Sequence, residues 1–211
     1  MGHLIRRDIT RAWSGGAGMP VAFLLLVASL FPFAVGPDVR LLGQTGGGMV
    51  WIAALLAALL PVDRLITPDR DAGVLDQLAL RGISEEIVAL AKMIAHWISF
   101  GPPLIIAALP ASALLKLELP VIMRLEVGLL LGTPALAALG ILAAALTAGV
   151  RSASALAGLL ALPLAIPVLI FGAGSLHEGS HGALKFLAAV SLVLVALTPI
   201  AAGAALRAGR E

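Results

Sequence analysis

The chain has 211 residues, of which 60% are hydrophobic and only 12% are charged, and its mean hydropathy is +1.06. Soluble domains carry about 25% charged residues, and one small soluble domain cannot bury this much apolar surface. The composition therefore excludes a soluble globular fold. The formal charge of +2 gives no indication of a nucleic-acid partner, and the absence of cysteine excludes disulfides and thiolate metal sites.

Six apolar segments follow one another along the chain, each long enough to cross a lipid bilayer. A transmembrane helix needs about 20 apolar residues, and a helix satisfies its own backbone hydrogen bonds in lipid. We therefore predict an all-α integral membrane protein in the lipid bilayer, with a single transmembrane domain over residues 1–211. The expected spans are residues 19–36, 46–62, 87–109, 126–149, 152–175 and 183–206.

The basic residues divide unequally between the two sides of the membrane that these spans define. One side receives Arg6, Arg7, Arg11, Arg64, Arg70, Arg81, Arg151, Arg207 and Arg210, and the other receives Arg40, Lys116, Arg124 and Lys185. Cytoplasmic loops carry the excess of lysine and arginine, so we expect the first side and both termini to be cytoplasmic. Lys92, near the start of the third span, can extend its stem toward that same surface.

The most polar stretch between two spans covers residues 62–86. Thr67 and Pro68 are typical of a helix start, and Gly82 is typical of a helix end. Between them, one helical face would be apolar, formed by Val74, Leu75 and Leu78. We therefore predict one short amphipathic helix on the cytoplasmic surface, between the second and third spans.

This loop helix allows two interpretations, which the pattern alone does not separate. It either ties two spans together or docks a cytoplasmic partner such as a transport ATPase. The chain is not itself an ATPase, because a Walker A loop requires Gly-Lys-Ser/Thr, whereas its lysines follow Ala91, Leu115 and Leu184. The spans also lack the series of charged residues that ion-coupled carriers use. We therefore expect no enzymatic activity in this chain.

Three histidines are candidates for ligand binding. His96 lies within the third span, where an ionisable side chain is a functional candidate, although a neutral histidine bonded between helices is the favoured interpretation. His177 and His181 have a spacing that could hold a metal or haem iron on a helix. Their neighbours Gly179 and Gly182 favour a flexible loop instead.

Small and aromatic residues indicate how the spans pack. Gly128 and Gly132 form a G-x-x-x-G pair, which allows helix backbones to approach closely in a packed bundle or a homodimer. Trp13 and Trp51 are typical of the membrane interface, where tryptophans are enriched. We expect a second copy of the chain in the assembly.

Five segments carry a family resemblance that covers the chain from the first span onward. They are SLFPFAVGP (29–37), VWIAALLAALLPVDRL (50–65), LAKMIAHW (90–97), LLLGTPALAALG (129–140) and LPLAIPVLIF (162–171). Together they make the chain similar to protein B of the cytochrome c maturation haem exporter, the CcmB family, a permease subunit of an ABC transporter. The resemblance implies an ABC-2 exporter-like fold in the bacterial inner membrane.

The same resemblance implies partners. They are an ABC ATPase subunit that hydrolyses ATP, other cytochrome c maturation membrane subunits and a haem chaperone. No cofactor is expected to be bound directly by this chain, and haem is the candidate cargo. The chain has no W-W-D segment of the kind with which a partner subunit handles haem, which fits a role without direct haem ligation.

The family carries a loop motif, F-x-x-D-x-x-D-G-S-L, that is thought to meet the ATPase subunit. In this chain it corresponds to residues 66–75, where Asp69, Gly73 and Leu75 match and Ile66, Ala72 and Val74 depart from it. We therefore expect the ATPase-coupling surface to comprise Asp69, Gly73, Leu75, Gln77 and Leu78.

Two alternatives remain open from the sequence. One is an ABC-2 type permease for another cargo, such as a lipid or a drug. The other is a non-transporting membrane scaffold that holds an assembly complex together. A secondary carrier ranks below both, because the spans lack coupling-ion residues.

Overall fold

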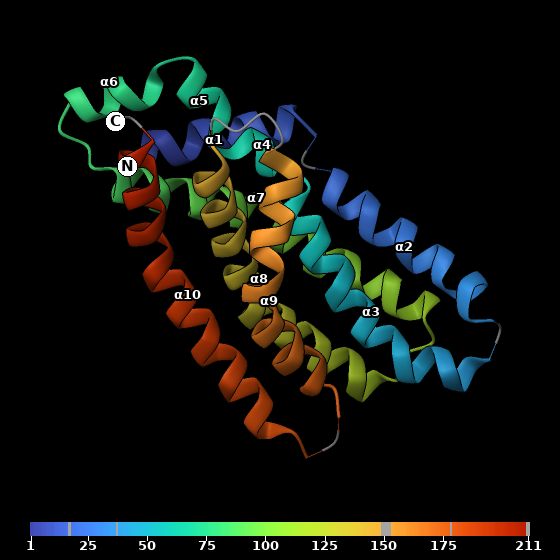
Figure 1. Ribbon diagram of the computed structural model, residues 1–211. Coiled ribbons are helices and arrows are strands. Elements are labelled where there is room, and N and C mark those ends of the chain that lie inside the picture. Colours follow the sequence, from blue (N-terminus) through green and yellow to red (C-terminus); the bar gives the residue numbers. More distant parts are fainter. Residues whose placement is uncertain (17, 37, 149–152, 178, 210–211) are drawn as a thin grey trace.

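The computed structural model describes residues 1–16, 18–36, 38–148, 153–177 and 179–209, and every regular element within these ranges is a helix (Figure 1). Four helices are each long and apolar enough to cross a membrane, namely α3 (Val39–Leu59), α7 (Glu85–Leu114), α8 (Leu119–Thr147) and α10 (His181–Ala208). The predicted all-α fold is confirmed, and the chain is a multi-pass membrane protein.

Two further apolar helices are shorter. α2 (Met19–Val35) follows α1 (Gly2–Ser14) at an angle of 47°, and the pair counts as a fifth span if it is taken as one bent crossing. α9 (Ala153–Gly174) contains a shorter apolar stretch. All six expected segments are therefore helical. How many of these helices cross the membrane stays a prediction.

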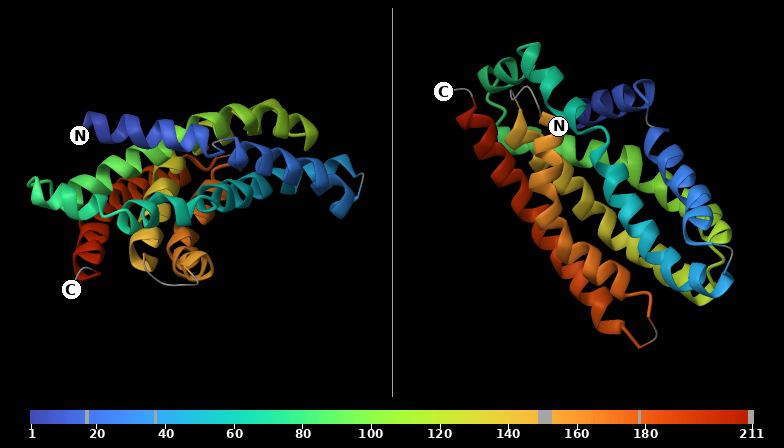
Figure 2. Two further views of the ribbon diagram at one scale, coloured as in Figure 1. Left: turned by 90° about the horizontal axis from the view of Figure 1, so that it is seen from above. Right: turned by 45° about the vertical axis from the view of Figure 1, so that its right-hand side comes forward.

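The bundle is built around α8. This helix packs against α7, α9 and α10, and its side chains Leu136, Leu139 and Ile141 are almost completely buried. α2 packs against α3 and α7, so that α2 and α10 lie on opposite sides of the bundle (Figure 2). The apolar side chains on the outside of α2, α9 and α10 are the surface that a membrane protein presents to lipid.

α3 begins at Val39, well before the expected start of the second span at residue 46. The cause is a local cap: Asp38 Oδ1 accepts hydrogen bonds from the backbone N–H groups of Arg40 and Leu41, at 2.8 and 3.3 Å. An aspartate in this position satisfies donors that the first helical turn leaves free. The polar residues before the apolar run therefore join the helix instead of forming a loop.

The expectation that Trp51 lies at the membrane interface is wrong. Trp51 is completely buried in the core, where its indole ring lies against three glycines from two other helices. A Cβ atom added at Gly128, Gly132 or Gly172 would come within 3.2, 2.6 and 2.6 Å of the ring. The small residues of α8 thus make room for a large side chain of the same chain.

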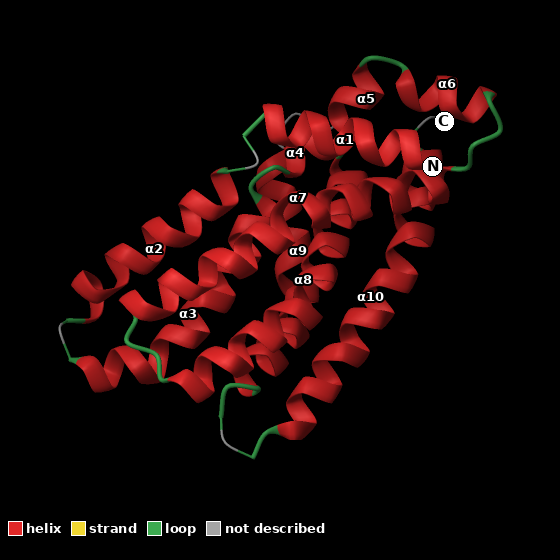
Figure 3. Cartoon of the chain, turned by 180° about the vertical axis from the view of Figure 1, so that it is seen from behind, coloured by secondary structure: helices red, strands yellow, loops and turns green. Residues whose placement is uncertain are grey.

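Both chain ends gather at one end of the bundle with three short helices (Figures 1 and 3). These are α4 (Val62–Leu65), α5 (Thr67–Asp71) and α6 (Val74–Leu80). Four positions used in the predictions lie outside the described residues. They are Arg151 and Arg210, assigned to the cytoplasmic side, and Gly149 and Ser152, assigned to span boundaries.

Candidate functional site

The predicted single helix between the second and third spans is instead two helices. α5 and α6 are separated at Gly73, which has a φ of +66°, a left-handed conformation that glycine adopts without strain. The predicted stop at Gly82 is confirmed, because this residue has a φ of +75° and the next N–H, that of Ile83, bonds back to the Leu78 carbonyl. Local cap signals therefore marked the ends of the segment but not its interruption.

Asp69 of α5 is buried, with 2% of its surface exposed. Its Oδ1 accepts a hydrogen bond from Arg11 at 2.6 Å, and its Oδ2 accepts bonds from Arg7 and Lys92, each at 2.5 Å. The two arginines lie one turn apart on α1, whereas Lys92 lies on α7. One carboxylate therefore joins three helices that are far apart in sequence.

Asp8 adds a second carboxylate to this group. It pairs with Arg7 at 2.7 Å and with Lys92 at 3.3 Å. We call Arg7, Asp8, Arg11, Asp69 and Lys92 the charge cluster. Lys92 is 6% exposed, so it extends to the predicted end of the bundle but finds carboxylates there instead of open water. Hydrogen bonds between full charges are stronger than neutral ones, and they offset the cost of burying these groups.

The partners of Asp69 and Arg7 favour the charged forms of both side chains. Burial alone would raise the pKa of Asp69, but Lys92, Arg11 and Arg7 outweigh that effect and lower it below its usual value of 3.8. Burial would likewise lower the pKa of Arg7, whereas Asp8 and Asp69 outweigh that effect and raise it above its usual value. Asp69 is therefore an ionised carboxylate held by three cations.

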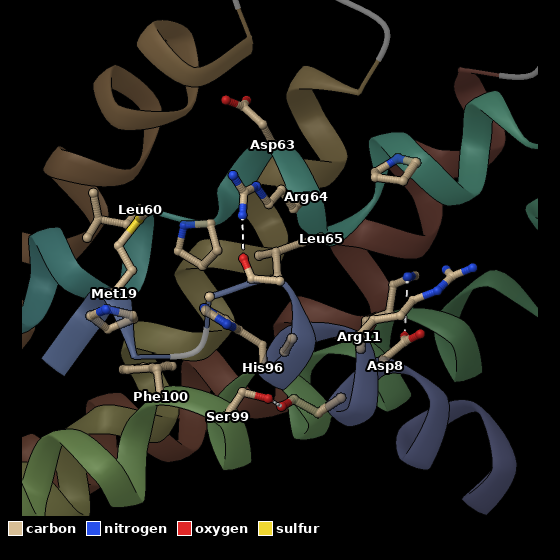
Figure 4. A pocket seen from close by; sticks show the side chains of 18 of the residues that line it. Asp8, Arg11, Met19, Leu60, Asp63, Arg64, Leu65, His96, Ser99 and Phe100 are labelled. Atoms are coloured by element: carbon tan, nitrogen blue, oxygen red, sulfur yellow. Dashed lines mark hydrogen bonds and ion pairs between the residues drawn. The ribbon is translucent and has the colours of Figure 1, made fainter. Parts of the chain in front are cut away.

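A cavity of about 430 Å³ lies beside the charge cluster (Figure 4). Its walls come from α1, the connection to α2, the end of α3, α4, α5 and α7. Charged side chains on these walls include Asp8, Arg11 and Lys92, and Arg64 of α4 donates a 2.6 Å hydrogen bond to the Gly15 carbonyl. The cavity is therefore lined by residues of α1 on one side and by residues of α7 on another.

His96 lies on the wall of this cavity and is 4% exposed. Its Nε2 lies 3.0 Å from the Ala58 carbonyl, to which it donates a hydrogen bond, and its ring packs on Phe100 with a centroid distance of 4.7 Å. The favoured interpretation, a histidine bonded between two helices, is confirmed.

His177 is exposed in the connection between α9 and α10, and His181 is the first residue of α10, with a side chain outside the described residues. The two histidines therefore do not share one helix, which removes the geometric basis of the proposed ligand pair. Within the described part of the chain, no three histidine or carboxylate side chains come together as a metal site would require.

The five residues expected to form the ATPase-coupling surface do not lie on one face. Gln77 is exposed and Gly73 is partly exposed, whereas Asp69 is in the charge cluster and Leu75 and Leu78 are buried, at 6% and 8%. The two leucines belong to the hydrophobic core, so they fasten α6 to the bundle. An exposed surface must use the other side of α6.

Leu80 dominates that other side, with 89% of its surface exposed beside Gln77. Leu80 was not among the candidates predicted from the sequence. The available signal was an apolar residue that interrupts the polar face of a surface helix.

Two further arginines join helices at this end of the bundle. Arg70 of α5 donates a 3.1 Å hydrogen bond to the Gly209 carbonyl, just beyond α10. Arg207 of α10 pairs with Glu85 at 3.4 Å and also with Glu86, both in the first turn of α7. The short helices, the two termini and α7 are therefore connected by charged and polar side chains.

Comparison with known proteins places the whole chain in one family. The family model described as "CcmB protein" matches residues 1–209. The chain is 45% identical to "Heme exporter protein B" of Rhodobacter capsulatus and 44% identical to the protein of that name in Paracoccus denitrificans, with 98% of each chain covered in both cases. It is 40% identical to the Escherichia coli protein, over 89% of this chain and 88% of that one. A match of this extent shows that the chain belongs to the CcmB protein family.

Proposed function

We propose that this chain is the membrane permease subunit of an ABC-type haem exporter that serves cytochrome c biogenesis. The support is the full-length family membership together with relatives that carry the name "Heme exporter protein B". A separate ATPase subunit hydrolyses ATP in this proposal, which agrees with the lack of a Walker A sequence in this chain.

The ATPase subunit docks on the exposed side of α6, at Gln77 and Leu80 and the adjoining Gly73 turn. The side chain of Leu80 is 89% exposed there, beside the exposed Gln77, so both side chains are accessible to a partner protein. Leu75 and Leu78 contribute to docking indirectly, because they hold α6 against the bundle. Asp69 contributes from within the charge cluster, without touching the ATPase.

The protein lies in the bacterial inner membrane with both termini in the cytoplasm. This orientation is supported by the excess of arginine at the end of the bundle that carries α4, α5, α6 and the two termini (Figure 3). It brings the docking surface to the compartment that holds ATP.

The assembly contains a second copy of the chain, other cytochrome c maturation membrane subunits and a haem chaperone. Haem is its cargo, and this chain binds neither haem nor ATP as a resident cofactor. A permease for lipids or drugs predicts normal c-type cytochromes in the experiment below. A scaffold without transport predicts their loss as well, and is distinguished because vesicles reconstituted with the complex would move no haem.

The test is deletion of the gene in its native host, followed by complementation. Deletion is expected to abolish c-type cytochromes on a haem-stained gel, and the unmodified chain is expected to restore them. Complementation with Leu80→Arg should leave the chain in the membrane but remove the ATPase from the purified complex. Thr10→Arg, at an exposed position on α1 at the same end, serves as the matched control.

Normal c-type cytochromes in the deletion strain would overturn the haem-export proposal in favour of another cargo. Retention of the ATPase by Leu80→Arg would overturn the assignment of the docking surface to α6.

A further inference from the structure

We propose that Asp69 is a positioning residue that locks α1 to the docking segment, which comprises α4, α5 and α6. Because of this contact, α1 and α5 move as one body and α2 moves with them. This inference rests on the proposed function, and it assigns Asp69 a role different from direct contact with the ATPase.

The first argument is that no oxygen of Asp69 is free for a partner protein. Oδ1 is bonded to Arg11 and Oδ2 to Arg7 and Lys92, and the residue is 2% exposed. A carboxylate enclosed in this way cannot reach across an interface. Its chemical effect is confined to its own helix, α5, and to the two helices from which its partners come, α1 and α7.

The second argument is the cavity beneath α1. Asp8, Arg11 and Ala12, in the second half of α1, line this cavity. Leu4, near the start of α1, packs against the core. Ion pairs therefore contribute to the position of α1 beside the cavity, and Asp69 makes two of them, with Arg7 and Arg11.

The third argument is a second link between the same two parts of the chain. Arg64 of α4 donates its 2.6 Å hydrogen bond to Gly15, in the connection between α1 and α2. The docking segment thus holds α1 at Asp69 and the start of the next connection at Arg64. A displacement of α6 would pass through α5 to α1 and then to α2.

The test uses paired spin labels in the complete complex with its ATPase. The chain has no cysteine, so pairs of introduced cysteines are its only labelling sites. Thr10 and Asp71 are exposed on α1 and α5, and this pair reports the distance across the lock. Phe33 on α2, 88% exposed, and Lys185 on α10, also exposed, report the position of α2 in the bundle.

In the native complex, the 10–71 distance should be narrow and unchanged by a non-hydrolysable ATP analogue, while the 33–185 distance shifts. In Asp69→Asn, the 10–71 distribution should broaden and the nucleotide-dependent 33–185 shift should disappear, although the ATPase still co-purifies. Asp69→Glu keeps the carboxylate and should restore a narrow 10–71 distance.

A second variant separates the loss of the contact from misfolding of Asp69→Asn. Arg7→Gln combined with Arg11→Gln leaves the buried pair of Asp69 and Lys92 in place and should broaden the 10–71 distance in the same way. A broader 10–71 distance that follows only from the instability of Asp69→Asn would not appear in this double variant, because the two arginine side chains that it replaces are 29% and 58% exposed.

Three results would overturn the lock. They are a native 10–71 distance that changes with nucleotide, a native 33–185 distance that does not, and a narrow 10–71 distance in both variants. Absence of the ATPase from the native complex would instead contradict the proposed function. The two failures are distinguishable, because the 10–71 distance without nucleotide still tests the contact between α1 and α5.

Discussion

Asp69 on α5 and Lys92 on α7 form a buried ion pair, with 2.5 Å between Oδ2 and Nζ. The two residues differ in how many other partners they have. Asp69 also binds Arg7 and Arg11, whereas Lys92 otherwise contacts Asp8 at 3.3 Å. This asymmetry predicts which of the two removals is more harmful.

Asp69→Asn should lower the free energy of unfolding by about 3–5 kcal/mol, the usual cost of leaving a buried charge without its partner. Lys92→Met should cost less, because Asp69 keeps two arginines and the new side chain is apolar. Thermal unfolding of both variants in the same detergent would measure the order. Equal losses, or a larger loss for Lys92→Met, would contradict the arrangement of the cluster.

Acid should weaken the charge cluster. The pKa of Asp69 is lower in the folded protein than its usual 3.8, so its contribution to stability is complete above that value. The contribution is lost as the pH falls from about 3.8 through the lower folded pKa, because the unfolded chain then binds the proton first. Asp8, Arg7, Arg11 and Lys92 are the other charged groups that face this carboxylate.

The measurement is the unfolding temperature of the native chain and of Asp69→Asn over pH 3 to 7. The difference between them should shrink below about pH 3.8, where the carboxylate of the unfolded chain binds a proton before that of the folded protein does. A difference that stays constant below pH 3.8 would show that folding does not lower the pKa of Asp69.

Trp51 and the glycines around it should be energetically coupled. Trp51→Ala should cost about 3–5 kcal/mol through the cavity that it leaves in the core. Gly132→Ala should also destabilise, because the new Cβ would lie 2.6 Å from the ring. In the double variant the two losses should not add, since the smaller side chain makes room for the Cβ.

Gly48→Ala is the matched control for this cycle. A Cβ at Gly48, also in a helix of the bundle, would meet nothing within 4 Å. The change should be neutral or raise stability by up to about 1 kcal/mol, the helix-propensity difference between the two residues. Additive losses for Trp51→Ala and Gly132→Ala would show that the ring does not occupy this position.

The two sides of α6 should respond differently to charge. Leu80→Arg, on the exposed side, should detach the ATPase without changing the unfolding temperature. Leu78→Arg, on the buried side, should lower the unfolding temperature and reduce ATPase binding together, because α6 loses its attachment to the core. The measurement is co-purification of the ATPase, with thermal unfolding of the same samples. A stable Leu78→Arg complex would show that Leu78 is not buried in the assembly.

Local patterns in the sequence predicted the helices well. Long apolar runs must form helices in lipid, and Gly82 ended a helix because glycine readily adopts a positive φ. The break at Gly73 was missed, because the apolar pattern of Val74, Leu75 and Leu78 continues smoothly from a start at Thr67. A periodic pattern places residues on a face but does not show whether the helix is continuous.

The candidate site was harder to predict, because its contacts join distant parts of the chain. Asp69 was identified from the motif, but its partners Arg7 and Arg11 lie 62 and 58 positions away, on a helix whose arginines were used only for topology. Trp51 was placed at the interface for a similar reason. Nothing near Trp51 in sequence shows that Gly132 and Gly172 surround its ring.

The indole of Trp51 lies between backbones of α8 and α9 while its own backbone belongs to α3. The ring therefore fixes the three helices relative to one another, because sliding any one of them along its axis would bring a backbone into contact with the ring. α3, α8 and α9 are therefore expected to move together as one group. Large movements in this protein should accordingly be rotations of other helices against this group, and not a general loosening of all helices.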